Sequence, residues 1–480
     1  MKKSKKKKNG NKLWQAIMAS LVVMIFFTHC KDDALVQKDS YDPSKPIVID
    51  HFSPDSGRVA TQMLIYGSNF GSDRSKINVT IKDKKAAVIN VTDDGTIIYC
   101  IVPTLRGNVT VQEGDHDSGF VKVKIENQEA SASKEFQYTY SQNVSTFLGF
   151  TDQDGNSAIV DGDFEVAQFE TPFWMAFDRP EGEGVPRNLF LIEEDRGIRF
   201  INMQERKVET LFRTGNNFNR PRTMAFTFDY DTMIVAHDAG GWGDIGTVIL
   251  VRDPISGRFP NSWKVVMNHK QCNGGAIHPV TGEYWFNSYE QSQVYKVKNR
   301  SSIPWVYGNA TGTNANGSEG LNYFFLVQDR GWEFNIQIAP SGRFAYIVSK
   351  NKHYIARMEF NFATGNFEKP QSQSFVGSIN TSGFLDGVGL NTLFWEPQQG
   401  AFDEEDNFYV ADGLNNCIRK VTPTGQVSTF AGRPQNSGYS DGALRDAQFY
   451  HPFGIIYDNI NQTFYVADRG NHRIRTIVVE

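Results

Sequence analysis

Cysteine is scarce in this chain: among 480 residues there are four, Cys30, Cys100, Cys272 and Cys417. No Cys-x-x-Cys pair and no cysteine–histidine spacing suited to zinc occurs, and the three beyond Cys30 are too scattered to define a disulfide framework. These three are therefore expected to be small buried apolar residues.

Several catalytic motifs are missing as well. The chain contains no Gly-x-Ser-x-Gly turn, no phosphate-binding P-loop and no His-Glu-x-x-His. The run from Asp152 to Asn156 looks briefly like a calcium loop, but Ser157 stands where such a loop requires glycine. No familiar nucleophile or metal loop can be assigned from these patterns.

Long hydrophobic runs are absent too. Residues 1–12 carry seven lysines and no acid, residues 13–27 are mostly apolar, and Cys30 follows closely. A basic segment before an apolar one too short for a comfortable membrane span is typical of an export signal. An uncleaved anchor or an ordinary secreted protein is the alternative.

The residues around Cys30 refine this interpretation. The segment from Phe27 to Cys30 resembles a bacterial lipoprotein box, although Phe27 and His29 depart from the usual residues, and Lys31-Asp32-Asp33 resembles the surface-export signal of Bacteroidetes lipoproteins. The resemblance implies a signal peptide over 1–29 and a lipidated Cys30 with a tether over 30–45. It also implies a lipid anchor in the outer membrane, facing the cell exterior.

Positive charge is in short supply once the leader is set aside. The remaining chain has 42 basic and 54 acidic side chains, a net charge of −12. Such a chain repels phosphate backbones rather than gathering them. Nucleic acid is therefore not expected as a partner.

Residues 46–140 alternate apolar and polar positions in short runs broken by turns, as at 63–66, 77–81, 97–102 and 120–125. This length and pattern suit one β-sandwich. Phe52-Ser53-Pro54, Tyr66-Gly67 to Gly71 and Val102-Pro103 together resemble the IPT/TIG immunoglobulin-like family. Because the segment has no tryptophan for sugar stacking, a spacer role is favoured over ligand binding.

The rest of the chain repeats one pattern. Asp-Gly, six residues, Phe, two residues and Pro occur at Asp161, Asp386 and Asp441, and the second half recurs at Phe218 and Pro221. A unit that cannot bury its own face implies an array of stacked units. The pattern therefore predicts consecutive β-propeller blades.

The amino-acid sequence of the last repeats resembles that of the NHL family, as in Tyr409-Val410-Ala411-Asp412 and the segment 427–432. The resemblance implies an all-β chain in which the β-sandwich precedes a six-bladed propeller over 141–480. Blade six is expected to end at its third strand, 473–479. Strand 143–149 matches 426–432 and is expected to close the ring as the missing fourth strand. A long insertion over 307–331 is expected between blades three and four.

Five aromatic residues are candidate ligand-binding residues: Trp174, Trp242, Tyr289, Trp332 and Trp395. They fall where loops between blades, and between second and third strands, emerge on one face of a propeller. Flat aromatic faces beside amides are what sugar rings stack on. Packing in the core is the alternative for each of them, and Trp242, set between glycines, is the foremost candidate.

Metal chemistry would need ligands that converge. His237, His353 and His472 each fall on a second-to-third-strand loop of a different blade, so together they are only minor candidates for holding Ca²⁺ or Zn²⁺. No cofactor is expected. Asp412 and Asp468 are expected to tie loops to backbone amides rather than to act on a substrate.

Proteins resembling this arrangement commonly accompany outer-membrane glycan-uptake systems. The resemblance therefore implies a non-catalytic surface lipoprotein that binds a polysaccharide or oligosaccharide on the propeller loops, with an outer-membrane transporter complex as a partner. Two other classes stay open. A lactonase-like hydrolase or a polysaccharide lyase would place its active site at the channel mouth, and a scaffold would bind a partner protein there.

Overall fold

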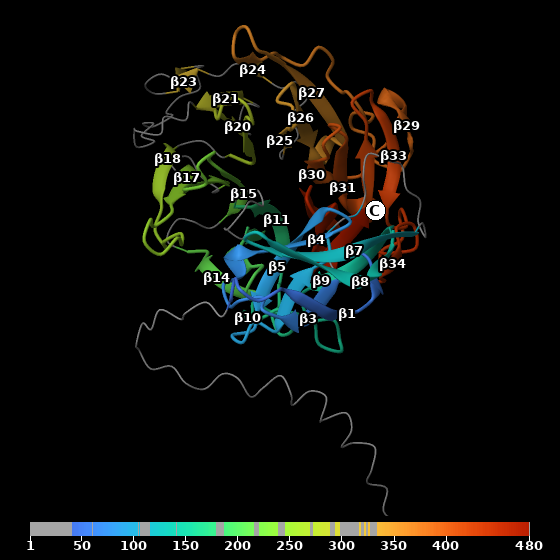
Figure 1. The fold of residues 1–480 in the computed structure, drawn as a ribbon. Coiled ribbons are helices and arrows are strands. Elements are labelled where there is room, and N and C mark those ends of the chain that lie inside the picture. The colour runs from blue at the N-terminus through green and yellow to red at the C-terminus, as the bar shows by residue number, and fades with distance from the viewer. Residues whose placement is uncertain are drawn as a thin grey trace, which may run out of the picture.

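The computed structural model describes residues 41–59, 61–103, 105, 116–140, 142–178, 187–215, 220–238, 245–268, 272–288, 293–297, 316–317, 321–322, 325–326 and 334–479. These residues form an N-terminal β-sandwich and a ring of six blades (Figure 1). The expected all-β class with a six-bladed propeller is confirmed. The leader and Cys30 lie outside the described residues. Within the described part of the chain, no helix is long and apolar enough to cross a membrane.

The β-sandwich covers the IPT/TIG-like segment. Along β7, Val121, Val123 and Ile125 are buried while the residues between them are more exposed, as expected for a strand with one face on a core. Strand β5 pairs with β4 at its start and with β6 further along, and so joins the two sheets. The strands are β1 (Val48–Ser53), β2 (Ser56–Gly57), β3 (Gln62–Ser68), β4 (Ile77–Ile81), β5 (Lys84–Val91), β6 (Ile97–Ile101), β7 (His116–Ile125) and β8 (Gln128–Thr139).

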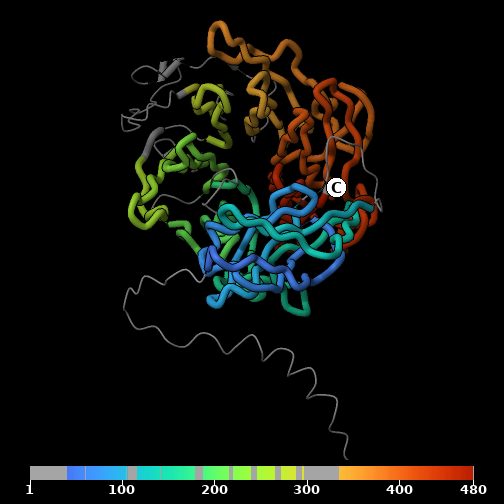
Figure 2. The backbone as a smooth tube through the Cα atoms, in the orientation of Figure 1, coloured from blue at the N-terminus to red at the C-terminus, as the bar shows by residue number. Residues whose placement is uncertain are grey.

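Blades one to three follow in chain order, each running from a first strand near the axis to a fourth at the rim (Figure 2). Blade one is β11 (Pro172–Phe177), β12 (Leu189–Glu193), β13 (Gly197–Asn202) and β14 (Lys207–Arg213), with β10 (Gly162–Asp163) added to β14. Blade two is β15 (Pro221–Phe226), β16 (Thr232–His237), β17 (Ile245–Val251) and β18 (Lys264–Asn268). Blade three is β19 (Gly275–Ile277), β20 (Tyr284–Ser288), β21 (Gln293–Val297) and β24 (Phe325–Leu326).

Blades four to six complete the ring. Blade four is β25 (Phe334–Ile338), β26 (Phe344–Ser349), β27 (Tyr354–Asn361) and β28 (Asn366–Phe367). Blade five is β30 (Pro397–Phe402), β31 (Phe408–Asp412), β32 (Cys417–Val421) and β33 (Gln426–Ala431), with β29 (Gly387–Val388) added to β33. Blade six is β35 (Pro452–Asp458), β36 (Thr463–Asp468), β37 (Arg473–Val479) and β9 (Gln142–Leu148), with β34 (Gly442–Ala443) added to β9. The first strands of neighbouring blades contact one another all the way round.

The second strands form the apolar layer between blades. Every residue of β12, β16, β31 and β36 is buried, because each of these strands packs against a neighbouring blade on both faces. In the sequence, strands that are buried on both faces are near-continuous apolar runs rather than alternating apolar and polar residues. Cys100, Cys272 and Cys417 are buried free cysteines, as the sequence indicates.

Strand β9 supplies the fourth strand of the last blade. It pairs antiparallel with β37 from Ile474↔Leu148 to Val479↔Gln142. Val144 and Leu148 are buried in clusters that also contain residues of blades one, five and six. The two ends of the propeller are therefore hydrogen-bonded to each other.

The segment expected to be a plain insertion contributes to blade three. Strand β24 lies near the end of 307–331 and pairs with β21, as Gln293↔Leu326 and Val294↔Phe325. A separate two-stranded ribbon, β22 (Asn316–Gly317) with β23 (Leu321–Asn322), precedes it. The expectation of a connection lying wholly between two blades is wrong, because blade three takes its rim strand from it.

The sandwich packs near the end of the propeller where third strands finish. Val478, at the end of β37, is part of the sandwich core, and the side-chain amide of Gln204, in the β13–β14 turn, lies 2.8 Å from the Arg74 guanidinium. The opposite end, which we name the loop face, carries the second-to-third-strand turns 194–196, 350–353, 413–416 and 469–472. It also carries the lead-in loops 168–171, 394–396 and 449–451. The described contacts between the sandwich and the propeller, at Val478 and Gln204, lie at the end opposite this loop face.

Candidate functional site

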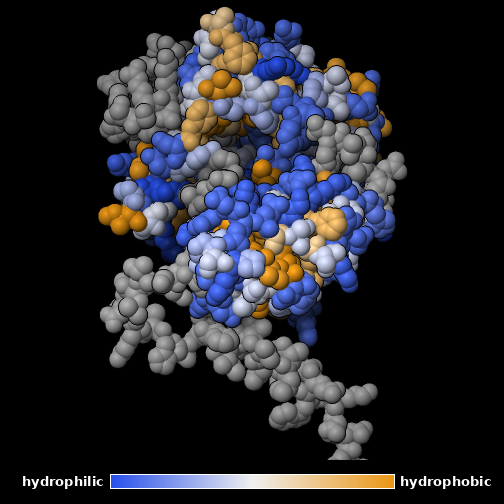
Figure 3. All heavy atoms as spheres, viewed as in Figure 1, coloured by the Kyte–Doolittle hydropathy of each residue, from blue (hydrophilic) through white to orange (hydrophobic). Residues whose placement is uncertain are grey.

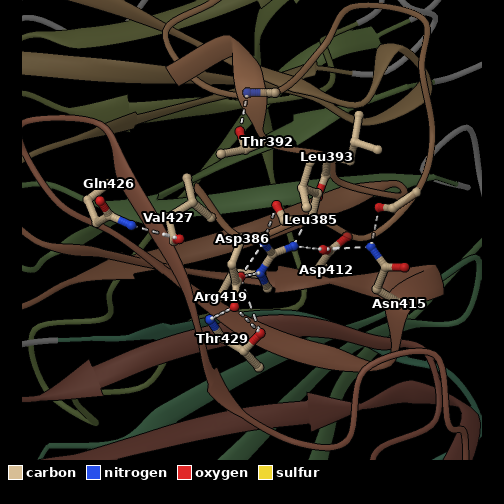
Figure 4. A network of polar contacts seen from close by, with 12 residues as sticks. Leu385, Asp386, Thr392, Leu393, Asp412, Asn415, Arg419, Gln426, Val427 and Thr429 are labelled. Carbon is tan, nitrogen blue, oxygen red and sulfur yellow. Dashed lines mark hydrogen bonds and ion pairs between the residues drawn. The ribbon is translucent and has the colours of Figure 1, made fainter. Parts of the chain in front are cut away.

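In each of three blades, the third strand carries a buried arginine at the same strand position. In blade five Arg419 is fully buried and donates to Asp412 at 2.8 Å and to Asp386 at 2.6 Å (Figure 4). It also donates to the carbonyls of Leu393 and Leu385, both at 3.0 Å. Blade one repeats the arrangement with Arg199, Glu193 and Asp161, and blade six with Arg475, Asp468 and Asp441.

These carboxylates hold the lead-in loops. Asp412 accepts from the backbone amide of Trp395 at 2.8 Å, and Asp468 accepts from that of Tyr450 at 2.8 Å. Burial raises the pKa of both Asp412 and Asp468 to about 6, against the opposing effect of the arginine beside each. The interpretation of these acids as loop ties is confirmed, whereas their arginine partners were not foreseen.

The three histidines also hold loops, each in its own blade. His237 Nε2 accepts from the amide of Arg220 at 3.1 Å, and it occupies the strand position taken by Asp412 and Asp468 elsewhere. His353 Nδ1 accepts from the amide of Glu396 at 3.2 Å, in the next blade. The structure does not bring these histidines together.

His472, the third of these histidines, also holds a loop. Its Nδ1 lies 2.6 Å from the carbonyl oxygen of Glu170, so blade six is tied to blade one. No group of three or more histidine, cysteine or acidic side chains among the described residues is placed to hold a metal ion.

A pocket opens where the first strands converge on the axis. Its empty volume, solvent at the mouth included, is ≈ 320 Å³. Every blade contributes to its wall. The lining residues are Phe173, Trp174, Arg222, Thr223, Asn273, Phe334, Asn335, Lys350, Gln398 and Phe453.

A β-bulge aims these side chains at the axis. In blades one, two, five and six the register shifts just after the first-strand proline. The residue following that proline then lines the pocket in all four blades, as Phe173, Arg222, Gln398 and Phe453. The repeated proline is thus the sequence signal that could have located the pocket.

The wall contains both aromatic rings and polar groups. Phe173 and Phe453 stack with ring centroids 3.6 Å apart, and the Lys350 ammonium lies 5.7 Å from the Phe453 centroid. Gln398 is 1% exposed and Arg222 is 4% exposed. Such a wall can accept a flat ring and bind its substituents through amide and cationic donors.

Of the five aromatic candidates, one lines the pocket. Trp174 is buried, and it belongs to a core cluster as well as to the pocket wall. Trp395 is 39% exposed on the loop face but is not among the lining residues. Trp242, Tyr289 and Trp332 lie outside the described residues, so their role stays a prediction.

Ion pairs on the loop face hold Arg222 in place. Arg222 pairs with Asp238 at 3.1 Å and with Glu194 at 3.0 Å. Glu194 also pairs with Arg469 from blade six. Since these residues come from blades one, two and six, the network fixes the geometry of the pocket mouth across three blades.

His451 lies beside this network and is neutral at physiological pH. Burial, assisted by the positive charges of Arg469 and Lys350, lowers its pKa to about 4. Its Nδ1 faces Arg469 Nη1 at 3.4 Å, which fits an unprotonated nitrogen.

This shift predicts a loss of stability in acid. The folded state takes up a proton less readily than the unfolded state, whose histidine pKa is about 6.5, so the penalty grows as pH falls from about 6.5 to about 4. Replacing His451 with Asn, which tolerates the left-handed backbone found here (φ 50°), should remove about 2–3 kcal/mol of that acid sensitivity. Denaturant midpoints of both proteins at pH 7 and pH 4 measure it, and parallel pH profiles would refute it.

Comparison with known proteins identifies both domains. The IPT/TIG domain family matches residues 46–140. A part of the chain is 35% identical over 100 residues to NHL repeat-containing protein 2 of Bos taurus, which is 20% of this chain and 14% of that protein. The chain spans at most 26% of the length of the curated relatives first matched.

Solved structures match almost the whole chain. An auxiliary nutrient binding protein from Bacteroides thetaiotaomicron is 33% identical with a TM-score of 0.61, over 91% of this chain and 98% of that one. Another from Bacteroides ovatus is 28% identical with a TM-score of 0.62, over 92% and 99%. A further Bacteroides thetaiotaomicron protein, described provisionally as a phosphatase, is 32% identical with a TM-score of 0.62, over 92% and 99%.

Proposed function

The chain, which joins an IPT/TIG domain to an NHL-type β-propeller, belongs to the same family as the Bacteroides thetaiotaomicron protein to which it is 33% identical, and on that basis we propose that it is a nutrient-binding protein. Its ligand is a polysaccharide or oligosaccharide, and its site is the central pocket of the loop face. It binds this ligand without cleaving it.

The observation that carries this proposal is the composition of the pocket wall. Phe173, Trp174 and Phe453, each more than nine-tenths buried, present small apolar ring areas, and Asn335 and Gln398 supply amides at the same depression. The C–H face of a sugar packs on an aromatic ring while its hydroxyl groups exchange hydrogen bonds with amides. The names of two relatives, auxiliary nutrient binding proteins, support the same class of function.

Location is part of the proposal. A lipid on Cys30 would hold the chain at the outer membrane, facing the cell exterior, beside a transporter complex that takes up the captured glycan. The sandwich lies at the propeller end opposite the loop face. A tether leading into the sandwich would therefore leave the pocket open to the medium. The face of the molecule shown in Figure 3 is mostly hydrophilic, with hydrophobic patches between the polar residues.

A variant that fills the pocket tests the binding site. Asn335→Trp places a bulky ring in the pocket wall and should reduce retardation by the bound polysaccharide at least about tenfold in affinity electrophoresis, by removing room for one sugar ring. Residues 31–480 would be run against plant, host and microbial polysaccharides, with a reducing-end assay in parallel.

The control is Asn459→Trp, which adds the same ring at an exposed turn on the far face. Equal weakening by both variants would place the site elsewhere. New reducing ends, or release of unsaturated products, would replace binding with the hydrolase or lyase function. No retardation by any polysaccharide would reject glycan binding for that panel and favour a protein partner.

A further inference from the structure

The pocket wall is positively charged. Arg222 and Lys350 line it, and none of the described lining residues is acidic. The carboxylates of Asp238 and Glu194 that pair with Arg222 belong to the second-to-third-strand turns and are not part of the lining. A group entering the pocket therefore meets cationic and amide donors before it meets an acid.

A second observation points to an incoming acceptor. The Gln398 side chain is 1% exposed, and its Nε2 has no hydrogen-bond partner among the residues that the structure describes. A buried donor left unsatisfied is destabilising, so a ligand oxygen that accepts a hydrogen bond from it gains binding free energy. Gln398 lines the same pocket as Lys350 and Arg222, so the three donors face one space.

The charge of the whole chain limits the kind of anion. Without the leader the net charge is −12, which disfavours a densely charged polymer over long range. Local contacts in a partly buried pocket are screened less than that long-range field. A sparsely charged oligosaccharide is repelled little by the negative chain at long range, and its few anionic groups are still attracted by the cations of the pocket.

We propose that the pocket recognises a sugar residue bearing an anionic substituent, a carboxylate or a sulfate ester. The ammonium of Lys350 supplies the charge, and Gln398 Nε2 donates to an oxygen of the anion. Arg222, whose charge is offset by its two ion pairs, fixes the shape of the wall beside them. The stacked rings of Phe173 and Phe453 pack beside the sugar. This inference rests on the proposed glycan-binding function and names the ligand class within it.

Matched ligands test the proposal. Isothermal titration would compare uronate-bearing oligosaccharides with the same oligosaccharides after the carboxyl is reduced, and sulfated oligosaccharides with their desulfated forms. The acidic member of one pair should bind at least tenfold more tightly, and that preference should shrink between 50 and about 500 mM salt. The pair that shows the preference identifies the anion.

Lys350→Met should remove most of the preference, because the acidic member loses the charged contact and therefore loses more affinity than the neutral member does. The control, Lys352→Met, changes the same charge on the same turn, where Lys352 donates to Asn380 at 2.6 Å instead. Neutral members bound as tightly as acidic ones would overturn the anion proposal and leave glycan binding standing. Binding of neither member, in any pair, would overturn both.

Discussion

A propeller that begins at Thr151, and so lacks strand β9, is expected to lose cooperative folding. Strand β9 makes an antiparallel ladder with β37 over Gln142 to Leu148, and it buries Val144 and Leu148. The two side chains alone contribute about 3–6 kcal/mol of burial. The free energy of unfolding of a domain is about 5–15 kcal/mol, so the loss removes a large part of it.

The matched control is a propeller that begins at Gln142. It lacks the sandwich as well, but it keeps β9 and the ring closure. Its main cost is exposure of Val478, which packs in the sandwich core in the full chain. Calorimetry should show one sharp transition for this control and a broad or much earlier one for the shorter chain, whose β37 edge is open to aggregation. Equal melting of the two would show that closure by β9 is dispensable.

Arg475→Met is expected to destabilise the protein by about 3–5 kcal/mol at pH 8. Arg475 is fully buried and holds Asp468, Asp441 and the carbonyls of Gln448 and Ser440. Removing it leaves the carboxylate of Asp468 buried without its counter-charge. Guanidinium denaturation of both proteins measures the difference.

The pH dependence of this loss follows from Asp468. Its pKa already lies at about 6, above the unfolded value of 3.8, because of burial, and loss of Arg475 raises it further. The folded variant therefore binds a proton that the unfolded chain does not, and the deficit should shrink as pH falls from 8 to 5. Adding Asp468→Asn should recover much of the loss at pH 8. A deficit that stays constant with pH and survives the second change would mean that lost packing dominates.

The propeller could be predicted because each blade repeats a local requirement. An Asp-Gly turn, a buried phenylalanine such as Phe394 and a proline that begins the first strand recur at fixed spacing. The buried arginines that pair with these acids also follow a sequence pattern. Arg419 follows Asp412 by seven residues, and Arg475 follows Asp468 by seven residues. They were missed because a charged side chain on a strand is more often exposed.

The pocket was harder to predict than the face that carries it. Its wall comes from six blades that are distant in sequence, and in four of them the bulge after the first-strand proline decides which side chain turns to the axis. Loop aromatics were therefore favoured over strand residues. Trp174 was identified, whereas Arg222, Lys350 and Gln398 were not: Arg222 and Gln398 follow a repeated proline whose bulge the sequence does not reveal, and Lys350 has no such marker.

The central claim is that the loop-face pocket holds a sugar, and a crystal structure of the protein with its bound oligosaccharide tests it most directly. We expect a sugar ring beside Phe173 and Phe453, with an anionic oxygen within hydrogen-bond distance of Lys350 and Gln398. An oligosaccharide bound on the sandwich or on the opposite face of the propeller, with the pocket free of it, would contradict the claim.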